Sequence, residues 1–275
     1  PGARCVDWLP VSTHRKATTA NIVHRIGIHA PAARVNQALA TRKPRALQCS
    51  GKALHLPPPP PMVTATTLAV VSDIHGNLPA LRAVVDDAHA LGIRHFINLG
   101  DSLSGPLYPR ETAEYLMSVD WLQIRGNHER QVLGEGISQR GPSDQFTYDA
   151  LDDTHLAWIR SLPATAWWSP EVYLCHGTPH SDLEYLLEGF EGTRFHERTP
   201  EQVQPLVEGV NAQVVLCGHS HLPRVLRVPH GPLVVNPGSV GCPAYLDTRM
   251  EPNFAHQTGT PDARYGIATR RGTEW

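Results

Sequence analysis

Residues 68–78 read LAVVSDIHGNL: an apolar run, a polar turn and the beginning of a second apolar pattern. Four consecutive apolar residues at 68–71 predict a β-strand that is buried on both faces. Asn77 can cap a helix that has Pro79 in its first turn, and the apolar residues that follow recur at helical spacing until Gly92. The stretch therefore predicts a strand, a polar loop and a helix in direct succession.

The same succession recurs along the chain and predicts an α/β fold. Strands are expected over residues 68–71, 95–99, 121–124, 172–175, 214–217, 224–228, 233–235 and 264–269, and helices over residues 78–91, 110–119, 151–162 and 200–210. Alternating strands and helices favour a largely parallel or mixed sheet with helices on the outside. Ligands of such sheets bind beyond the carboxyl ends of the strands, so we expect a functional site there.

A polar motif closes five of these apolar runs. In chain order the motifs are Asp73-Ile74-His75, Gly100-Asp101, Gly126-Asn127-His128-Glu129, His176-Gly177 and Gly218-His219-Ser220-His221. They supply carboxylates, an amide and imidazoles, a mixture of oxygen and nitrogen donors that suits borderline divalent metals. A pair of ions needs a ligand that bridges both, and the central Asp101 is the candidate. The two residues at each end of the series, Asp73 with His75 and His219 with His221, can each chelate one ion.

Charge counting connects this ligand set with phosphate. Two divalent ions, two aspartates and a bridging hydroxide leave a centre of about +1, which attracts and polarises a phosphate group. Two ions about 3.5–4 Å apart can also generate hydroxide at neutral pH and hold the phosphoryl oxygens. The motifs therefore predict a phosphohydrolase in which a hydroxide on a dinuclear metal site attacks phosphorus. Mn, Fe, Ni, Co and Zn all suit the ligands.

The ordered set D-x-H, G-D, G-N-H-E, H-G and G-H-x-H resembles the calcineurin-like metallophosphoesterase superfamily over residues 68–245. The resemblance implies a four-layer α/β/β/α sandwich with mixed sheets and with the metals at the carboxyl ends of the strands. It also implies two ligand sets: Asp73, His75, Asp101 and His221 for one ion, and Asp101, Asn127, His176 and His219 for the other. His128 would not be a ligand but would stabilise phosphate charge and protonate the leaving oxygen.

Within the superfamily, the residues after Gly100-Asp101 favour a phosphodiesterase. Protein Ser/Thr phosphatases carry an arginine shortly after this motif, whereas residues 102–107 here read SLSGPL. The compact motif spacing and the NPGS sequence at residues 236–239 resemble the small bacterial phosphodiesterases. We expect a phosphate-ester small molecule or a nucleotide as substrate. The candidates to bind it are Asn127, His128, Arg224 and His180.

Other functions of such a site stay open. A phosphomonoesterase or a protein phosphatase of the same superfamily would use the same metal ligands. An interaction scaffold with weak catalysis, like a retromer subunit related to this family, should lack ligands or the acid histidine, and here each expected position is filled. Zinc hydrolases of the β-lactamase type carry an H-x-H-x-D-H run that this sequence does not contain.

The charge distribution divides the chain near residue 61. Residues 1–61 contain nine Lys/Arg and one acid, Asp7, whereas residues 62–275 contain 15 basic and 25 acidic residues. We expect the first segment to be a disordered or non-native extension and residues 62–275 to form the metallophosphoesterase domain. Because no partner strand is evident for residues 264–269, the domain is expected to continue past Trp275. The acidic body argues against an obligatory nucleic-acid partner.

Cysteine usage and hydropathy favour a cytoplasmic protein without a membrane partner. The five cysteines form no C-x-x-C pair, which is typical of a reduced intracellular protein. No apolar run approaches the roughly 18 residues that a transmembrane helix needs. An organelle is the alternative location if the Arg-rich N-terminal segment is a transit peptide. Cys175 and Cys217 are expected to be buried small hydrophobic residues, with a role as thiolate ligands left open.

Overall fold

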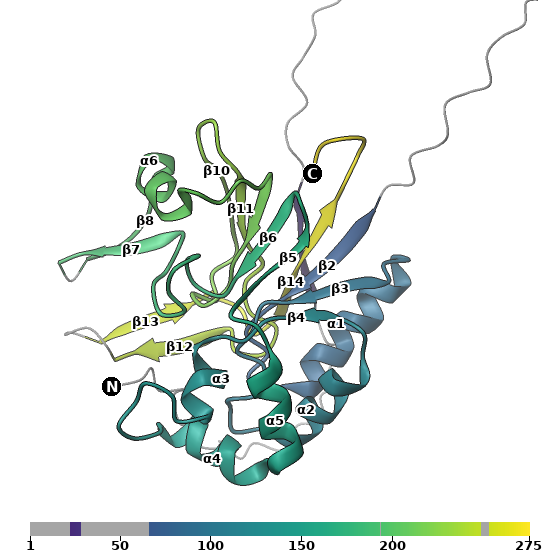
Figure 1. The fold of residues 1–275 in the computed structure, drawn as a ribbon, viewed down its shortest axis with the longest axis vertical. Helices are drawn as coiled ribbons and strands as arrows, with labels where there is room; N and C mark the ends of the chain where they lie inside the picture. The colour runs from purple at the N-terminus through teal and green to yellow at the C-terminus, as the bar shows by residue number, and fades with distance from the viewer. Residues whose placement is uncertain (1–22, 29–65, 193, 249–252) are drawn as a thin grey trace, which may run out of the picture.

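Two five-stranded mixed sheets lie at the centre of the structure (Figure 1). The computed structural model describes residues 23–28, 66–192, 194–248 and 253–275. The first sheet has the order β1-β14-β2-β3-β4 and consists of β1 (Val23–Ile28), β2 (Thr67–Val71), β3 (His95–Asn98), β4 (Leu122–Gln123) and β14 (Ala263–Thr269). β2, β3 and β4 are parallel, and β14 runs antiparallel to β2.

The second sheet has the order β10-β11-β9-β6-β5. It consists of β5 (Thr165–Ser169), β6 (Val172–Cys175), β9 (Val214–Leu216), β10 (Arg224–Arg227) and β11 (Leu233–Asn236). β6, β9 and β11 are parallel, whereas β5 and β10 run antiparallel to their neighbours. The short apolar runs predict the strands of both sheets except β1 and β5.

The two faces of β2 explain why its sequence is continuously apolar. Leu68 and Val70 lie in a buried cluster with Val172, Leu174 and Val214 of the second sheet, so the two sheets pack face to face. The alternate residues of β2 belong to a different cluster on the opposite face, because successive side chains of a strand point in opposite directions. A strand in the middle of a layered fold therefore needs apolar residues at every position.

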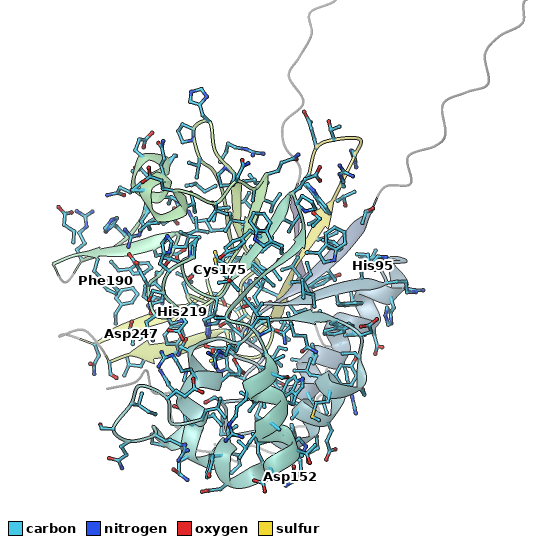
Figure 2. The ribbon with its side chains drawn as sticks, viewed as in Figure 1. His95, Asp152, Cys175, Phe190, His219 and Asp247 are labelled. Carbon is cyan, nitrogen blue, oxygen red and sulfur yellow. The ribbon has the colours of Figure 1, made fainter. Side chains whose placement is uncertain are left out.

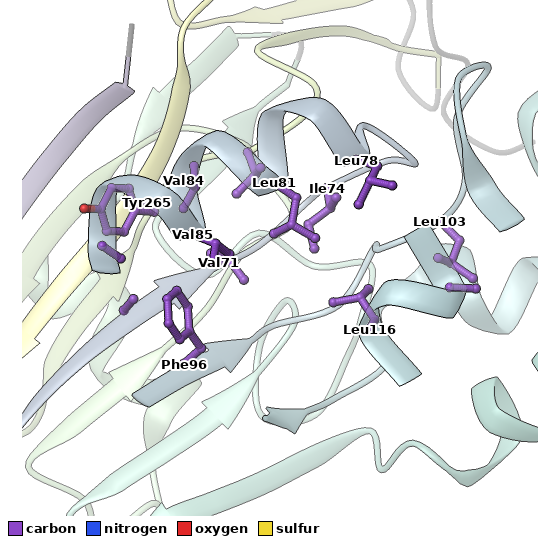
Figure 3. Packing of buried hydrophobic residues seen from close by; sticks show 14 of the residues in the cluster. Val71, Ile74, Leu78, Leu81, Val84, Val85, Phe96, Leu103, Leu116 and Tyr265 are labelled. Atoms are coloured by element: carbon purple, nitrogen blue, oxygen red, sulfur yellow. The ribbon is translucent and has the colours of Figure 1, made fainter. Parts of the chain in front are cut away.

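Helices cover the outer face of the first sheet. They are α1 (Leu78–Ala90), α2 (Pro109–Ser118) and α5 (Asp153–Ser161). Two further helices, α3 (Asn127–Val132) and α4 (Pro142–Ala150), lie between β4 and α5 in the chain. Figure 3 shows Leu81 and Val84 of α1 packed over Val71 and Phe96 of the sheet. The predicted cap of α1 is confirmed, since Asn77 Oδ1 accepts a hydrogen bond from the Ala80 amide.

A thinner layer covers the outer face of the second sheet. It consists of α6 (Pro200–Val203) and the 3₁₀-helix η1 (Gln204–Val207), where a single longer helix was expected. Pro205 lacks an amide hydrogen, so the α-helical hydrogen-bond ladder cannot continue through it. Cys175 and Cys217 lie fully buried in this layer, as expected of small hydrophobic residues. The order of the layers is therefore helix, sheet, sheet, helix, which confirms the expected α/β sandwich with mixed sheets.

Two hairpins project from the sandwich on the same side of Figure 1, and neither is predicted from the sequence. One is formed by β7 (Glu188–Glu191) and β8 (Arg194–Glu197), the other by β12 (Ala244–Asp247) and β13 (Phe254–Gln257). They contact one another through aromatic rings: Phe195 stacks on Phe254 with ring centroids 4.5 Å apart. This stacking joins β8 of one hairpin to β13 of the other.

The edge of the first sheet includes a segment from the basic N-terminal region. β1 pairs in parallel with β14, so β14 has a partner on each side and the expectation of a missing partner strand is wrong. Residues 1–22 and 29–61 of the predicted extension lie outside the described residues, and the boundary at residue 62 stays a prediction. No helix among the described residues combines the length and apolarity needed to cross a bilayer.

Candidate metal centre

The five polar motifs meet where parallel strands of the two sheets end. Loops after β2 and β3 are joined by a hydrogen bond from the Asp73 amide to the Gly100 carbonyl, 3.0 Å long. Loops after β6 and β9 are joined by a bond of 2.7 Å from the Gly218 amide to the His176 carbonyl. Figure 2 places His219 near the middle of the molecule, close to Cys175 at the end of β6. Sequence spacing had predicted this convergence.

The backbone is strained at this place. Five residues of the cluster have left-handed backbone angles: φ is 54° at Asp73, 50° at His75, 53° at Asp101, 67° at His219 and 60° at His221. Side chains with a Cβ disfavour this region, at a cost of about 1–3 kcal/mol each. His230 is the other non-glycine residue with positive φ in the described part of the chain. Such a concentration of strain is typical of a functional site.

All eight candidate side chains are buried together. The exposed fraction is at most 6% for Asp73, His75, Asp101, Asn127, His128, His176, His219 and His221. Buried charged and imidazole groups are stable only when they are paired with one another or with an ion. The contacts within the cluster therefore show what kind of partner it fits.

Three histidines are held so that Nε2 points into the cluster. Their Nδ1 atoms donate to backbone carbonyls: His75 to Ser104 at 2.6 Å, His221 to Cys242 at 2.6 Å and His176 to Leu99 at 2.8 Å. A carbonyl can only accept, so each Nδ1 carries hydrogen and each neutral ring keeps its Nε2 lone pair. The Nε2 atoms of His75 and His221 lie 3.2 Å apart. Two nitrogen lone pairs this close repel each other, and a cation bound between them would remove the repulsion.

The two aspartates divide their oxygens between the backbone and the cluster. Asp73 Oδ2 accepts from the His219 amide at 3.2 Å, and Asp101 Oδ1 accepts from the His128 amide at 2.9 Å. Asp101 Oδ2 lies 3.1 Å from His176 Nε2. Asp73 Oδ1 is fully buried, has no hydrogen-bond partner among the described residues and lies 3.3 Å from His221 Nε2. An orphaned carboxylate oxygen among imidazoles is a suitable metal ligand.

Electrostatics favour the charged forms of both aspartates. Burial raises the pKa of Asp73, but His221 and His176 together bring it below its usual range. Burial also raises the pKa of Asp101, which His176 and His128 bring well below its usual range. Burial lowers the pKa of His176, yet Asp101 raises it to about 10. The proton that His176 carries on Nε2 thus lies where a metal ion can bind, and binding of the ion would release this proton.

Two groups of donor atoms have Asp101 in common. Asp73, His75 and Asp101 each offer an atom within 4.8 Å of the others, and so do Asp101, His176 and His219. His219 Nε2 contacts the Leu183 carbonyl at 3.1 Å, so its Nδ1 is the nitrogen available for the second group. The residues fit a pair of borderline divalent ions in donor type and in number.

Gly126 keeps the space beside the shared aspartate open. A Cβ at this position would lie 2.2 Å from Asp101 Oδ1 and 2.8 Å from His176 Cε1. The next residue, Asn127, brings its Oδ1 to 3.2 Å from His176 Nε2. The loop that leads into α3 thus approaches the cluster as closely as a backbone can, and only glycine permits it.

Two acidic residues with roles that the sequence did not predict support the cluster. Asp144 of α4 accepts from His128 Nδ1 at 2.7 Å and from Ser104 Oγ at 2.7 Å. Glu129 accepts from the amides of Asp101, Ser102 and Gly126 at 2.7–2.8 Å. Asp144 belongs to no motif, and its role depends on a contact between distant segments. Glu129 stands inside a motif, but its spacing alone does not reveal three amide partners.

Tyrosines from the loop before β7 and from β12 enclose the last histidines. The ring of Tyr185 stacks on His219 with centroids 4.8 Å apart, and the ring of Tyr245 lies 4.5 Å from that of His221. Tyr185 Oη donates to Asp247 Oδ2 at 2.7 Å. Figure 2 shows Asp247 on the hairpin side of His219. This buried network restricts the orientation of both imidazoles, and no sequence signal pointed to it.

The structure does not bring Arg224 and His180 into the cluster. The guanidinium of Arg224 donates to the carbonyls of Leu187 and Arg198. His180 lies exposed in the turn at residues 178–181. Their contact with substrate stays a prediction. The hydrogen bonds of Arg224 connect this side chain with the two ends of the β7–β8 hairpin.

Glu188 is a buried acid behind the loop that carries His219, and Glu188→Gln is expected to stabilise the protein at alkaline pH. Neither carboxylate oxygen has a hydrogen-bond partner within the described residues, and burial raises the pKa of Glu188 to about 7, against the lowering effects of Ser220 and Arg224. The folded state then binds a proton that the unfolded state has lost, so this contribution to stability is present below the ordinary pKa and is lost as pH rises through about 7.

The measurement is urea unfolding of both proteins at pH 5 and pH 8. At pH 8 we expect Glu188→Gln to gain about 2–3 kcal/mol of unfolding free energy over the parent, and at pH 5 little or nothing. Glu208→Gln, at an exposed carboxylate just after η1, is the matched control. An equal difference at both pH values would contradict the assignment.

Comparison with known proteins agrees with the geometry. A model of the calcineurin-like phosphoesterase superfamily domain matches residues 67–255. An uncharacterized protein of Methanocaldococcus jannaschii is 28% identical in an alignment 200 residues long, which covers 64% of this chain and 76% of that protein. A metallophosphoesterase from Sphaerobacter thermophilus shares the fold with a TM-score of 0.54 and 24% identity, covering 75% of this chain and 88% of that one.

A hypothetical protein from Pyrococcus horikoshii has a TM-score of 0.55 at 18% identity, covering 70% of this chain and 87% of that one. These structural likenesses show the fold, while the family match spans the five motifs and the strands that carry them. The chain therefore belongs to the calcineurin-like phosphoesterase superfamily.

Proposed function

We propose that this protein is a dimetal phosphodiesterase. The observation that carries the proposal is the pair of buried donor groups that have Asp101 in common. One ion would be held by Asp73, His75, Asp101 and His221, and the other by Asp101, Asn127, His176 and His219. When bound, such ions lower the pKa of water and neutralise phosphoryl oxygens. Membership of a phosphoesterase superfamily supports phosphoric esters as the substrate class.

His128 is the group that we assign to the leaving oxygen. Its Nδ1 is directed to Asp144, which leaves Nε2 as the nitrogen that can deliver a proton. The carboxylate of Asp144 fixes the plane of the ring. The His128 ring lies edge-on to that of His75, with centroids 5.4 Å apart, so it stands beside the ligand groups. A general acid at this place would protonate the leaving alkoxide.

The charges around the cluster favour a diester. A monoester dianion benefits from an arginine clamp, but the arginines that flank the motifs already have partners. Arg125 pairs with Glu135 at 3.2 Å, and Arg130 forms two bonds of 2.7 and 2.9 Å to Asp182. A diester carries one negative charge and needs less cationic support. Within the diesters, small nucleotides are the class that we propose.

Metal analysis combined with kinetics tests this function. Purified protein should contain about two transition-metal ions per chain. After loading with Mn, Co, Ni or Zn in turn, kcat/KM should be higher for bis-p-nitrophenyl phosphate and cyclic nucleotides than for p-nitrophenyl phosphate. A protein that binds two ions but hydrolyses none of these substrates would be a scaffold, and a preference for the monoester would contradict the diester assignment.

A further inference from the structure

Cys242 places a thiol beside the candidate metal centre, although it belongs to none of the five motifs. Its Sγ and one ring nitrogen each of His75 and His221 all lie within 4.8 Å of one another. The residue is half-buried, in the loop that precedes β12. Cys175 and Cys217 differ from it, since both lie in the apolar layer behind the second sheet.

The backbone of Cys242 is tied to two of the ligand loops. Its amide donates to Ser239 Oγ at 2.8 Å, and that hydroxyl donates in turn to the Asp73 carbonyl at 2.7 Å. Its carbonyl accepts from His221 Nδ1 at 2.6 Å. The position of the residue relative to Asp73 and His221 is therefore fixed, and the thiol can move only by rotation about the Cα–Cβ bond.

A second observation at the same place points to a ligand. In the part of the chain that the structure describes, the fully buried Asp73 Oδ1 has no hydrogen-bond partner. It lies 3.3 Å from His221 Nε2, which itself lies 3.2 Å from His75 Nε2. Sγ now donates to the Ala244 carbonyl at 3.3 Å, a weak contact that one rotation would replace. The thiol therefore lies close to a ring nitrogen of each histidine, and Asp73 Oδ1 lies beside the His221 ring.

We propose that Cys242 binds, as thiolate, the ion that His75 and His221 hold. The inference rests on the metal centre of the proposed function and adds a ligand to it. Metal–sulfur bonds are about 2.3 Å long and metal–nitrogen bonds about 2.0–2.1 Å. A sulfur and a nitrogen that bind the same ion therefore lie less than 4.8 Å apart, and rotation of the Cys242 side chain can bring Sγ to such a distance from the histidine nitrogens. A thiolate is a soft ligand, so this position should prefer Zn or Co to Mn.

Cobalt spectroscopy of the full chain tests the proposal. The Co²⁺-loaded parent should show a thiolate-to-cobalt charge-transfer band in the near ultraviolet, and Cys242→Ser should lose that band while it keeps its cobalt. Cys217→Ala, which deletes a thiol from the apolar layer, is the matched control and should keep the band. In competition experiments, Cys242→Ser should also lower the Zn-to-Mn affinity ratio by about tenfold or more.

The outcomes separate this inference from the function on which it rests. If Cys242→Ser binds cobalt with the parent's stoichiometry and spectrum, Cys242 is not a ligand and the dimetal site is unaffected. If the parent binds no cobalt, zinc or manganese, both proposals are wrong. Loss of the band in Cys217→Ala but not in Cys242→Ser would also overturn the assignment.

Discussion

Asp101→Ala is expected to remove both metal ions and almost all phosphoesterase activity. Asp101 is the residue common to both donor groups, and its carboxylate is buried between His176 and the His128 amide. Loss of one ligand from each group should empty both positions. Because each ion contributes several kcal/mol to the transition state, kcat/KM should fall by about 10³-fold or more.

The measurement is metal content by elemental analysis together with kcat/KM. Asp101→Asn keeps an oxygen for the His128 amide and serves as a second variant if the alanine protein folds poorly. Asp120→Ala, at an exposed carboxylate between α2 and β4, is the control and should keep metal and activity. Normal metal content in both Asp101 variants would refute the shared position of this residue.

His128→Ala is expected to separate metal binding from turnover. His128 is hydrogen-bonded through Nδ1 to Asp144 and is assigned as proton donor, so the ions should stay while kcat falls by about 10²–10⁴-fold. The loss should be smallest for esters with acidic leaving groups, which depart without a proton. His95→Ala, at an exposed histidine that begins β3 and lies away from His219 in Figure 2, is the control.

Asp144→Asn distinguishes a role of Asp144 in proton transfer by His128 from a purely structural role. The amide keeps the shape of the side chain but removes the negative charge beside the His128 ring, so kcat should fall most for esters with basic leaving groups, which need a proton to depart. A purely structural contact would change stability and leave the dependence of kcat on the leaving group in place. Unchanged turnover of several diesters in His128→Ala would remove this histidine from the mechanism.

The sequence predicts the metal cluster well because its signals are local. Each ligand follows an apolar run that folds as a buried strand, and parallel strands bring their carboxyl ends to one region. Asp73, Asp101 and His176 therefore lie together although up to a hundred residues separate them in the chain. The same reasoning predicts α1 with its Asn77 cap, since cap and helical spacing are both contained in a few residues.

The rest depends on contacts between segments that carry no signal of their own. Asp144 supports His128 only because α4 packs near the loop after β3, and the role of Tyr185 arises from the loop that precedes β7. The four strands of the two hairpins are each four residues long, so their patterns are too short to recognise. Cys242 follows a turn whose approach to His75 only the folded chain reveals.

The five residues of the metal centre that have left-handed backbone angles imply an evolutionary trade-off between stability and activity. Their backbone strain amounts to several kcal/mol, which is comparable with the net stability of a typical domain. Glycine at any of these positions would relieve strain and remove a ligand at once. A lineage freed from selection for catalysis should therefore drift towards glycine here and become more heat-resistant as its chemistry disappears. Retention of all five side chains in this chain is what continued selection for metal binding would maintain.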